Sequence, residues 1–352
     1  MVRFGWMANG TMRHLACLLV SAVGTLLAQD AGSDSDPTIR VDVKLVRILA
    51  TVKDSTGALV GSMQRDDFEV RDNGVRQNIS VFERQTEQPL SVAVLIDNSG
   101  STAKDLKYET ESVIRFLKAL FHEGNPGDAA ALYSFNWQVV RQNNFTRSVA
   151  AVERNLRFLR GDAGTSLYDA ILLASRDIED RRGRKVLVLV TDGGDTTSRS
   201  DFQRAVEAAQ LADVVIYPIL VVPVNADAGR NTGGENALTM ISRRTGGRVF
   251  QPTLGSQMDA AFDQILRDLR TQYLIGFYPK DVPPTKDRYH SLRVGVQDPT
   301  ARVVARDGYY GEAVPETMPV SGGGGPGPLM GEDQTLRPRK PAVPKALKGK
   351  GP

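Results

Sequence analysis

Residues 91–101 read SVAVLIDNSGS, and this stretch decides the fold of the chain. An apolar run typical of a buried strand ends in Asp97, and Ser99 and Ser101 follow on a turn that contains Gly100. In open α/β sheets, ligands and ions bind at the carboxyl ends of the strands. One carboxylate and two hydroxyls on such a turn are oxygen donors that could hold a divalent cation without any histidine or cysteine.

Strands and helices alternate from this stretch to residue 270. Further apolar runs predict strands at residues 129–135, 138–145, 185–191 and 214–222. Helices are expected at residues 104–121, 149–159, 167–180, 202–212, 237–245 and 258–269. The run KVLVLVT at 185–191 is almost unbroken, as in a strand that is buried on both faces. The alternation predicts an α/β fold with a Rossmann-like, doubly wound and mostly parallel sheet.

Sequence of β type flanks this region on both sides. Alternating apolar residues between 39 and 81 predict strands, with Asp72-Asn73-Gly74 as a hairpin turn. Similar patterns return at residues 273–278, 290–296 and 301–306. Each flank holds about 40 residues, which is near the lower limit for independent folding. We therefore expect the flanks to pair into one small antiparallel β domain, with the α/β domain inserted between them.

Two further oxygen donors are expected at the same edge of the sheet as Asp97. Thr165 lies in the turn GDAGTSLYDA at the start of a helix, and Asp192 directly follows the strand KVLVLVT. All parallel strands present their carboxyl ends at that edge. Two carboxylates and three neutral hydroxyls suit Mg²⁺ or Mn²⁺, and they leave the ion able to attract one more carboxylate. The predicted metal ligands are Asp97, Ser99, Ser101, Thr165 and Asp192.

These five residues match the metal-ion-dependent adhesion site of von Willebrand factor type A domains, which the chain resembles over roughly residues 89–271. The segments GTSLYDAI (164–171), VLVTDGGDT (188–196) and TGGRVF (245–250) are also typical of that fold. The resemblance implies a bound Mg²⁺ or Mn²⁺ as cofactor and a role in adhesion or other protein binding rather than catalysis. It also implies a protein partner whose Asp or Glu completes the coordination of the metal.

The flanks resemble a bacterial subgroup of exported proteins, the type A-related domain family named after Acidobacteria. The matching segments are DFEVRDNGVRQNISVF (67–82), YLIGFYP (273–279) and DGYYG (307–311).

The start of the chain resembles an export signal. Arg3 and Arg13 lie before an apolar run at 15–28, which is shorter than the ~20 residues that span a bilayer. Leu26 is not the small residue preferred before a cleavage point, so an uncleaved anchor stays an alternative. The single cysteine, Cys17, lies in this run, which leaves no disulfide or thiolate site after cleavage. We expect a secreted, periplasmic or cell-envelope protein without a stable membrane span.

Charge gives no sign of nucleic-acid binding. The formal net charge is +3, but residues 29–311 contain 36 basic and 37 acidic residues. The predicted organisation is a signal peptide (1–28), a linker (29–37), a β segment (38–88), the type A domain (89–271), a second β segment (272–311) and a disordered tail rich in Pro, Gly and Lys (312–352).

Two other functions stay open. A Mg²⁺-dependent phosphatase would use Asp97 as its nucleophile, but such enzymes need a second Asp two residues later, where this chain has Ser99. A structural envelope protein would use the metal only to brace its loops. No Ser-His-Asp set is suggested, so no catalytic residue is predicted.

Overall fold

The computed structural model describes residues 44–84, 88–102, 106–122, 124–221, 231–252, 256–283 and 285–311. The predicted signal peptide, linker and tail lie outside these ranges. Within them, none of the helices combines the length and the apolar character that crossing a bilayer requires.

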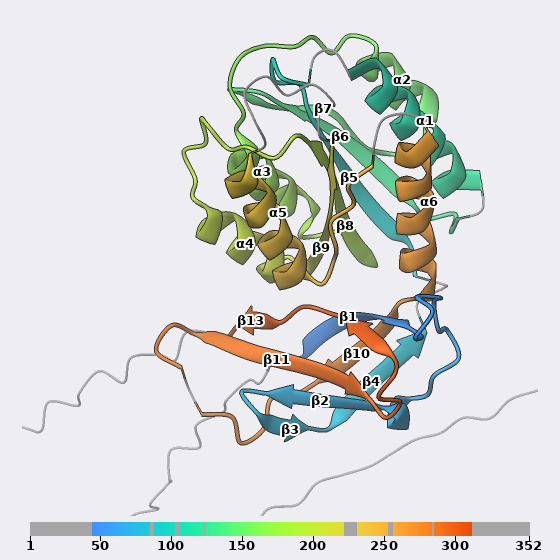
Figure 1. The fold of residues 1–352 in the computed structure, drawn as a ribbon, viewed down its shortest axis with the longest axis vertical. Helices are drawn as coiled ribbons and strands as arrows, with labels where there is room; N and C mark the ends of the chain where they lie inside the picture. The colour runs from blue at the N-terminus through green and yellow to red at the C-terminus, as the bar shows by residue number, and fades with distance from the viewer. Residues whose placement is uncertain are drawn as a thin grey trace, which may run out of the picture. The chain divides into compact units, whose positions relative to one another are not determined.

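A five-stranded sheet forms the middle layer of the α/β part (Figure 1). The strand order is β7-β6-β5-β8-β9, and only β7, at one edge, runs antiparallel to its neighbour. The strands are β5 (Leu90–Asp97), β6 (Ala129–Phe135), β7 (Val139–Thr146), β8 (Arg184–Thr191) and β9 (Val214–Leu220).

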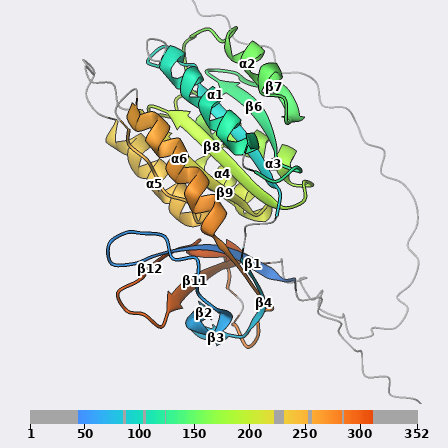
Figure 2. The same cartoon turned by 90° about the vertical axis from the view of Figure 1, so that its right-hand side faces the viewer.

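Helices cover both faces of this sheet. Val92 and Val94 of β5 pack against one group of helices, whereas Ala93 and Leu95 pack against the other. The first group is α1 (Leu106–His122), α2 (Val149–Leu156) and α6 (Ser256–Thr271). The second is α3 (Leu167–Ile178), α4 (Phe202–Leu211) and α5 (Thr232–Thr245). Figure 2 shows α1 and α6 side by side. Because both faces are buried, residues 92–96 of β5 and 186–190 of β8 are all apolar.

The two flanks form two four-stranded antiparallel sheets, ordered β12-β1-β10-β4 and β13-β11-β2-β3. Their apolar side chains share a separate core. The elements are β1 (Val46–Lys53), a 3-10 turn (Arg65–Asp67), β2 (Phe68–Asp72), β3 (Val75–Gln77), β4 (Ile79–Arg84), β10 (Tyr273–Phe277), β11 (Tyr289–Val296), β12 (Arg302–Val304) and β13 (Gly308–Tyr310). The predicted fold class, an α/β fold with antiparallel β structure from the flanks, is confirmed.

Pairing between the flanks explains why neither needs a core of its own. β1 pairs with β10, and β2 pairs with β11. The predicted hairpin turn joins β2 to β3, with Asp72 opposite Val75. Asn73 and Gly74 have φ of 47° and 86°, the left-handed backbone that a two-residue hairpin turn requires.

Helix α5 and strand β13 differ most from expectation. Helix α5 begins at Thr232, before the predicted start at residue 237, because the Asn231 side chain caps it by accepting a hydrogen bond from the Gly234 amide. The glycines that follow this cap conceal the start, since glycine disfavours helix. The short strand β13 lies beyond the last predicted strand, and three residues carry no usable periodicity.

Candidate functional site

Asp97 is the last residue of β5, the middle strand of the α/β sheet, and its side chain is fully buried. Its Oδ1 accepts a hydrogen bond from the Ser99 amide at 2.9 Å, and its Oδ2 accepts one from the Thr191 hydroxyl at 2.6 Å. Thr191 ends β8, which lies beside β5 in the sheet. The turn and the neighbouring strand therefore fix the orientation of the carboxylate together.

The turn after Asp97 brings two of the predicted hydroxyl ligands together. Ser99 Oγ and Ser101 Oγ lie 3.1 Å apart, the first in a buried residue and the second in an exposed one. The hydroxyl of Thr102 donates to the carbonyls of Asp97 at 2.8 Å and Ser99 at 3.1 Å. These bonds close the turn, so three predicted ligands come from one short, ordered segment.

A second loop, residues 160–166, lies against this turn. The Asp162 amide donates to the Asn98 carbonyl at 3.0 Å, and Asn98 Nδ2 donates to the Arg160 carbonyl at 2.7 Å. Ser99 and Asp162 also form an isolated parallel bridge. Thr165 is buried in the same loop, three residues after Asp162.

A third loop, which follows β8, is joined to the second. The Thr165 amide donates to the Thr196 hydroxyl at 2.9 Å, and the Thr196 amide donates to the Thr165 carbonyl at 2.9 Å. Asp192 begins this loop and is partly exposed. Gly193 then turns with φ of 104° beneath the start of α5, where a β-carbon on Gly234 would lie 1.3 Å from the Gly193 carbonyl oxygen. Position 234 therefore requires a glycine, because any side chain there would collide with the backbone of Gly193.

The electrostatics of Asp97 reflect its burial. Desolvation raises the pKa of this carboxyl to about 6, although the hydrogen bonds from Thr191 and Ser99 oppose the shift. The negative charge of Asp192 contributes to the same shift in a smaller measure than desolvation. Among the described residues, no Lys or Arg forms an ion pair with either carboxylate.

The donor set fits a hard divalent cation. Carboxylate and hydroxyl oxygens are the ligands that Mg²⁺ and Mn²⁺ take, and a cation would offset the repulsion between Asp97 and Asp192. The part of the chain that the structure describes holds no group of three or more His, Cys, Asp or Glu side chains suited to a metal. A metal at this edge would therefore depend on Ser and Thr hydroxyls as well as the two aspartates.

Several residues that support these loops were not predicted from the sequence. Thr191 and Thr102 hold Asp97 and its turn, but isolated threonines carry no sequence signal. Asp162 accepts a hydrogen bond from the indole N–H of Trp137 at 3.1 Å. Because Trp137 is 52% exposed and fixed in this way, it gives a rigid apolar surface beside the second loop.

Two other aspartates near the site have structural roles. Asp195 accepts a hydrogen bond from the Tyr168 amide at 3.2 Å. The carboxylate of Asp169 accepts bonds from the Arg199 and Ser200 amides at 2.9 and 2.8 Å. Both carboxylates therefore hold the third loop against α3.

Comparison with known proteins identifies the α/β part. The model of the von Willebrand factor type A domain family matches residues 91–264. None of the curated proteins compared matches the chain. Residues 91–264 thus form a von Willebrand factor type A domain.

Solved structures similar to the chain include several bacterial proteins. The von Willebrand factor domain of the type V pili tip protein Mfa5 from Porphyromonas gingivalis is 17% identical, with a TM-score of 0.44, and the match covers 51% of this chain and 95% of that one. BatB from Bacteroides thetaiotaomicron is 18% identical, with a TM-score of 0.40 and coverage of 51% and 98%. The pilus adhesin SpaC from Lactobacillus rhamnosus GG is 10% identical, with a TM-score of 0.43 and coverage of 69% and 47%.

Proposed function

We propose that this chain is an exported, non-enzymatic module that binds another protein through a divalent metal ion. Mg²⁺ or Mn²⁺ would be held by Asp97, Ser99, Ser101, Thr165 and Asp192. The bound ion would supply an open coordination position for an Asp or Glu side chain of the partner. The observation that carries the proposal is the set of hydrogen bonds that ties the loops of these five residues together at the carboxyl edge of the sheet.

Charge supports the binding of an acidic partner. Three of the five donors are neutral hydroxyls, so the ion keeps a strong attraction for another anionic ligand. Ser101 is exposed and Asp192 partly exposed, so a partner can approach the candidate site from solvent. Trp137 would add apolar contact area at its margin.

Metal binding tests the first half of the proposal. Calorimetric titration of Mg²⁺ or Mn²⁺ into the full chain should show one site, and Asp97→Asn should weaken binding by more than about 100-fold, because even supporting residues of metal sites are worth about 10–100-fold. Asp162→Asn is the matched control, since it removes a carboxylate from the same group of loops without removing a proposed ligand. We expect it to change affinity by less than about 3-fold.

Equal affinity of the Asp97→Asn variant and the original chain would contradict the proposed ligand set. Absence of any Mg²⁺ or Mn²⁺ binding by the original chain would reject the metal-dependent function as a whole.

The second half concerns the partner's carboxylate. Bound Mn²⁺ speeds the relaxation of water protons, and a ligand that displaces metal-bound water reduces this effect. A peptide rich in Glu should reduce it in a saturable manner, whereas the matched Gln peptide should not. Equal effects of the two peptides would contradict a carboxylate ligand. Metal binding without any carboxylate effect would instead favour a metal that only braces the loops.

The phosphatase alternative has no comparable support. A nucleophilic carboxylate must attack its substrate directly, whereas a metal ligand can also act through a bound water. Asp97 is fully buried and both its oxygens accept hydrogen bonds, which disfavours direct attack. Hydrolysis of a generic phosphoester panel by the chain, abolished in Asp97→Asn, would reverse this judgement.

A further inference from the structure

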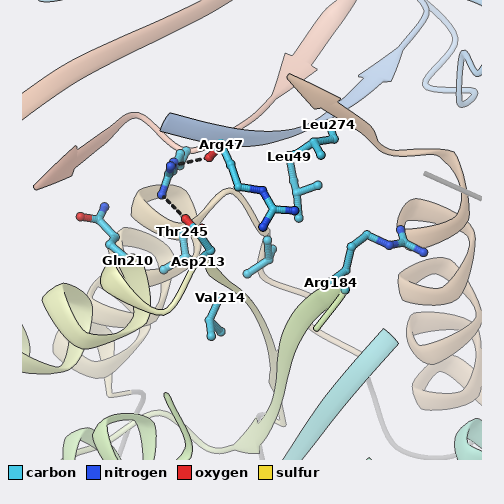
Figure 3. Close-up of a pocket in the computed structure, with 11 residues that line it drawn as sticks. Arg47, Leu49, Arg184, Gln210, Asp213, Val214, Thr245 and Leu274 are labelled. Carbon is cyan, nitrogen blue, oxygen red and sulfur yellow. Dashed lines mark hydrogen bonds and ion pairs between the residues drawn. The ribbon is translucent and has the colours of Figure 1, made fainter. Parts of the chain in front are cut away.

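A small cavity lies at the opposite edge of the α/β sheet from the candidate metal site, where β8 and β9 begin (Figure 3). The flanking β structure closes it from the other side with Arg47 and Leu49 of β1 and with Arg306. The cavity has a volume of about 30 Å³. A buried water needs about 10–15 Å³ on the same measure, so the cavity has room for roughly two or three waters or one small ion.

Four of the eleven residues that line this cavity are charged. Three arginines and one aspartate contribute to it: Arg47, Arg184, Arg306 and Asp213. Arg184 extends away from the other labelled side chains, and its Nη1 donates to the Leu269 carbonyl (Figure 3). Arg306 donates from Nη1 to Asp213 Oδ1 at 3.3 Å and from Nη2 to the Arg47 carbonyl. Asp213 therefore neutralises Arg306 and leaves Arg47 without a counter-charge.

Arg47 lines the cavity and is partly exposed to solvent. Figure 3 shows its side chain extending from β1 into the cavity. In the described parts of the chain, its guanidinium has no ion pair, and the carboxylate that lines the cavity, Asp213, is paired with Arg306 instead. Burial lowers the pKa of Arg306 and of Lys185. The charge of Asp213 opposes this shift in both groups, and the charge of Arg47 adds to it.

Arg306 also has a hydrogen-bond donor that is not satisfied by the described residues. It is 9% exposed, and its Nε–H has no partner among the described residues. A buried donor without a partner costs about 1–3 kcal/mol, and an anion in the cavity would offset that cost. Because guanidinium groups present paired donors that match the oxygens of phosphate and similar anions, the geometry favours such a ligand.

We infer that this cavity binds a small tetrahedral oxyanion, of the class of inorganic phosphate or sulfate, on Arg47 and Arg306. The anion would neutralise the excess positive charge between the flanking β structure and the α/β domain. It would thereby stabilise the contact between the two. This site does not depend on the proposed metal-dependent function, because it shares no residue with the loops at the carboxyl edge.

Thermal unfolding of the full chain in sodium phosphate, compared with sodium chloride at equal ionic strength, tests this inference. Phosphate at ten times its dissociation constant should raise Tm by roughly 2–5 °C, with saturation. The Arg47→Gln variant should lose this rise, while Arg302→Gln, which removes an exposed arginine of β12, should keep it. In chloride alone, Arg47→Gln should melt at the same temperature as the original chain or higher, because a repelling cation has been removed.

An equal phosphate-dependent rise in Arg47→Gln and the original chain would overturn the inference, since it would reflect a general salt effect. If Arg47→Gln does not fold, Arg47→Lys is the variant to test. Loss of at least half of the phosphate-dependent increase in Tm supports recognition by paired guanidinium donors. A full increase in Tm overturns that recognition. Glycerol 3-phosphate provides the last comparison. The small cavity should exclude it, and equal stabilisation by this ester would contradict a site for the free anion.

Discussion

The candidate site is centred on Asp97, and Thr191 orients the Asp97 carboxylate. The Thr191 hydroxyl donates to Asp97 and also accepts a hydrogen bond from the Gly193 amide at 3.1 Å. One buried side chain thus couples the first loop to the third. The five proposed ligands could be named from the sequence because each follows a strand or begins a helix. Thr191 could not, because a threonine at a strand end is indistinguishable from any other β residue.

Replacement of Thr191 with Val should therefore affect both stability and metal affinity. Loss of the hydroxyl leaves two buried polar groups without this partner, so we expect the free energy of unfolding to fall by about 1–3 kcal/mol. Metal affinity should fall about 10–100-fold, because the orientation of a ligand is lost. Urea unfolding and calorimetry measure the two effects. Thr239→Val, at an exposed position of α5, serves as the control, and unchanged metal affinity in Thr191→Val would argue against an orienting role.

At the scale of elements, the buried strands were the most predictable part of the fold. β5, β6 and β8 agree closely with their apolar runs, because a strand that is buried on both faces has few polar residues to confuse the pattern. The start of α5 was not predictable, because the helix has a glycine at position 234 for a reason that only the packing of α5 against another segment reveals. The residue is small so that α5 can pack against the turn at Gly193, which is far from it in sequence.

Adjacent glycines of α5 offer a matched test of this packing. A β-carbon on Gly234 would overlap the Gly193 carbonyl, whereas one on Gly233 would come no closer than 3.7 Å to the Asn231 side chain. Gly234→Ala should lower the free energy of unfolding by about 1–3 kcal/mol, as overpacking does. Gly233→Ala should leave it unchanged or raise it by up to about 1 kcal/mol, because alanine favours helix. Equal effects in urea unfolding would show that the close approach is not a constraint.

At the scale of the whole molecule, the β structure depends on residues that are far apart in the sequence, 227 positions for Ile275 and Ile48 and 193 for Ile275 and Phe82. Ile275 of β10 pairs with Ile48 on one side and Phe82 on the other, and it is fully buried. The sequence indicated that the flanks pair, because neither is long enough to fold alone. It did not indicate two sheets or their strand order, because the alternating pattern shows which face of a strand is buried but not which strand lies beside it.

Truncation of Ile275 to Ala tests this long-range pairing. The change should lower the free energy of unfolding by about 2–5 kcal/mol, the usual cost of a cavity in a packed core. Tyr278→Ala lies just past the end of β10 at an exposed position, and it should cost less than about 0.5 kcal/mol. Chemical denaturation measures both values. A small cost at Ile275 would mean that the shared β core adds little to the stability of the chain.

The central claim is that five oxygen-bearing side chains from three loops surround a single divalent ion. Anomalous diffraction from crystals of the full chain grown with Mn²⁺ tests it most directly, because the scattering locates the metal independently of any protein model. We predict one peak within coordination distance of the side-chain oxygens of Ser99, Ser101 and Thr165, with Asp97 and Asp192 bound directly or through water. A peak elsewhere, or none at this edge of the sheet, would contradict the account.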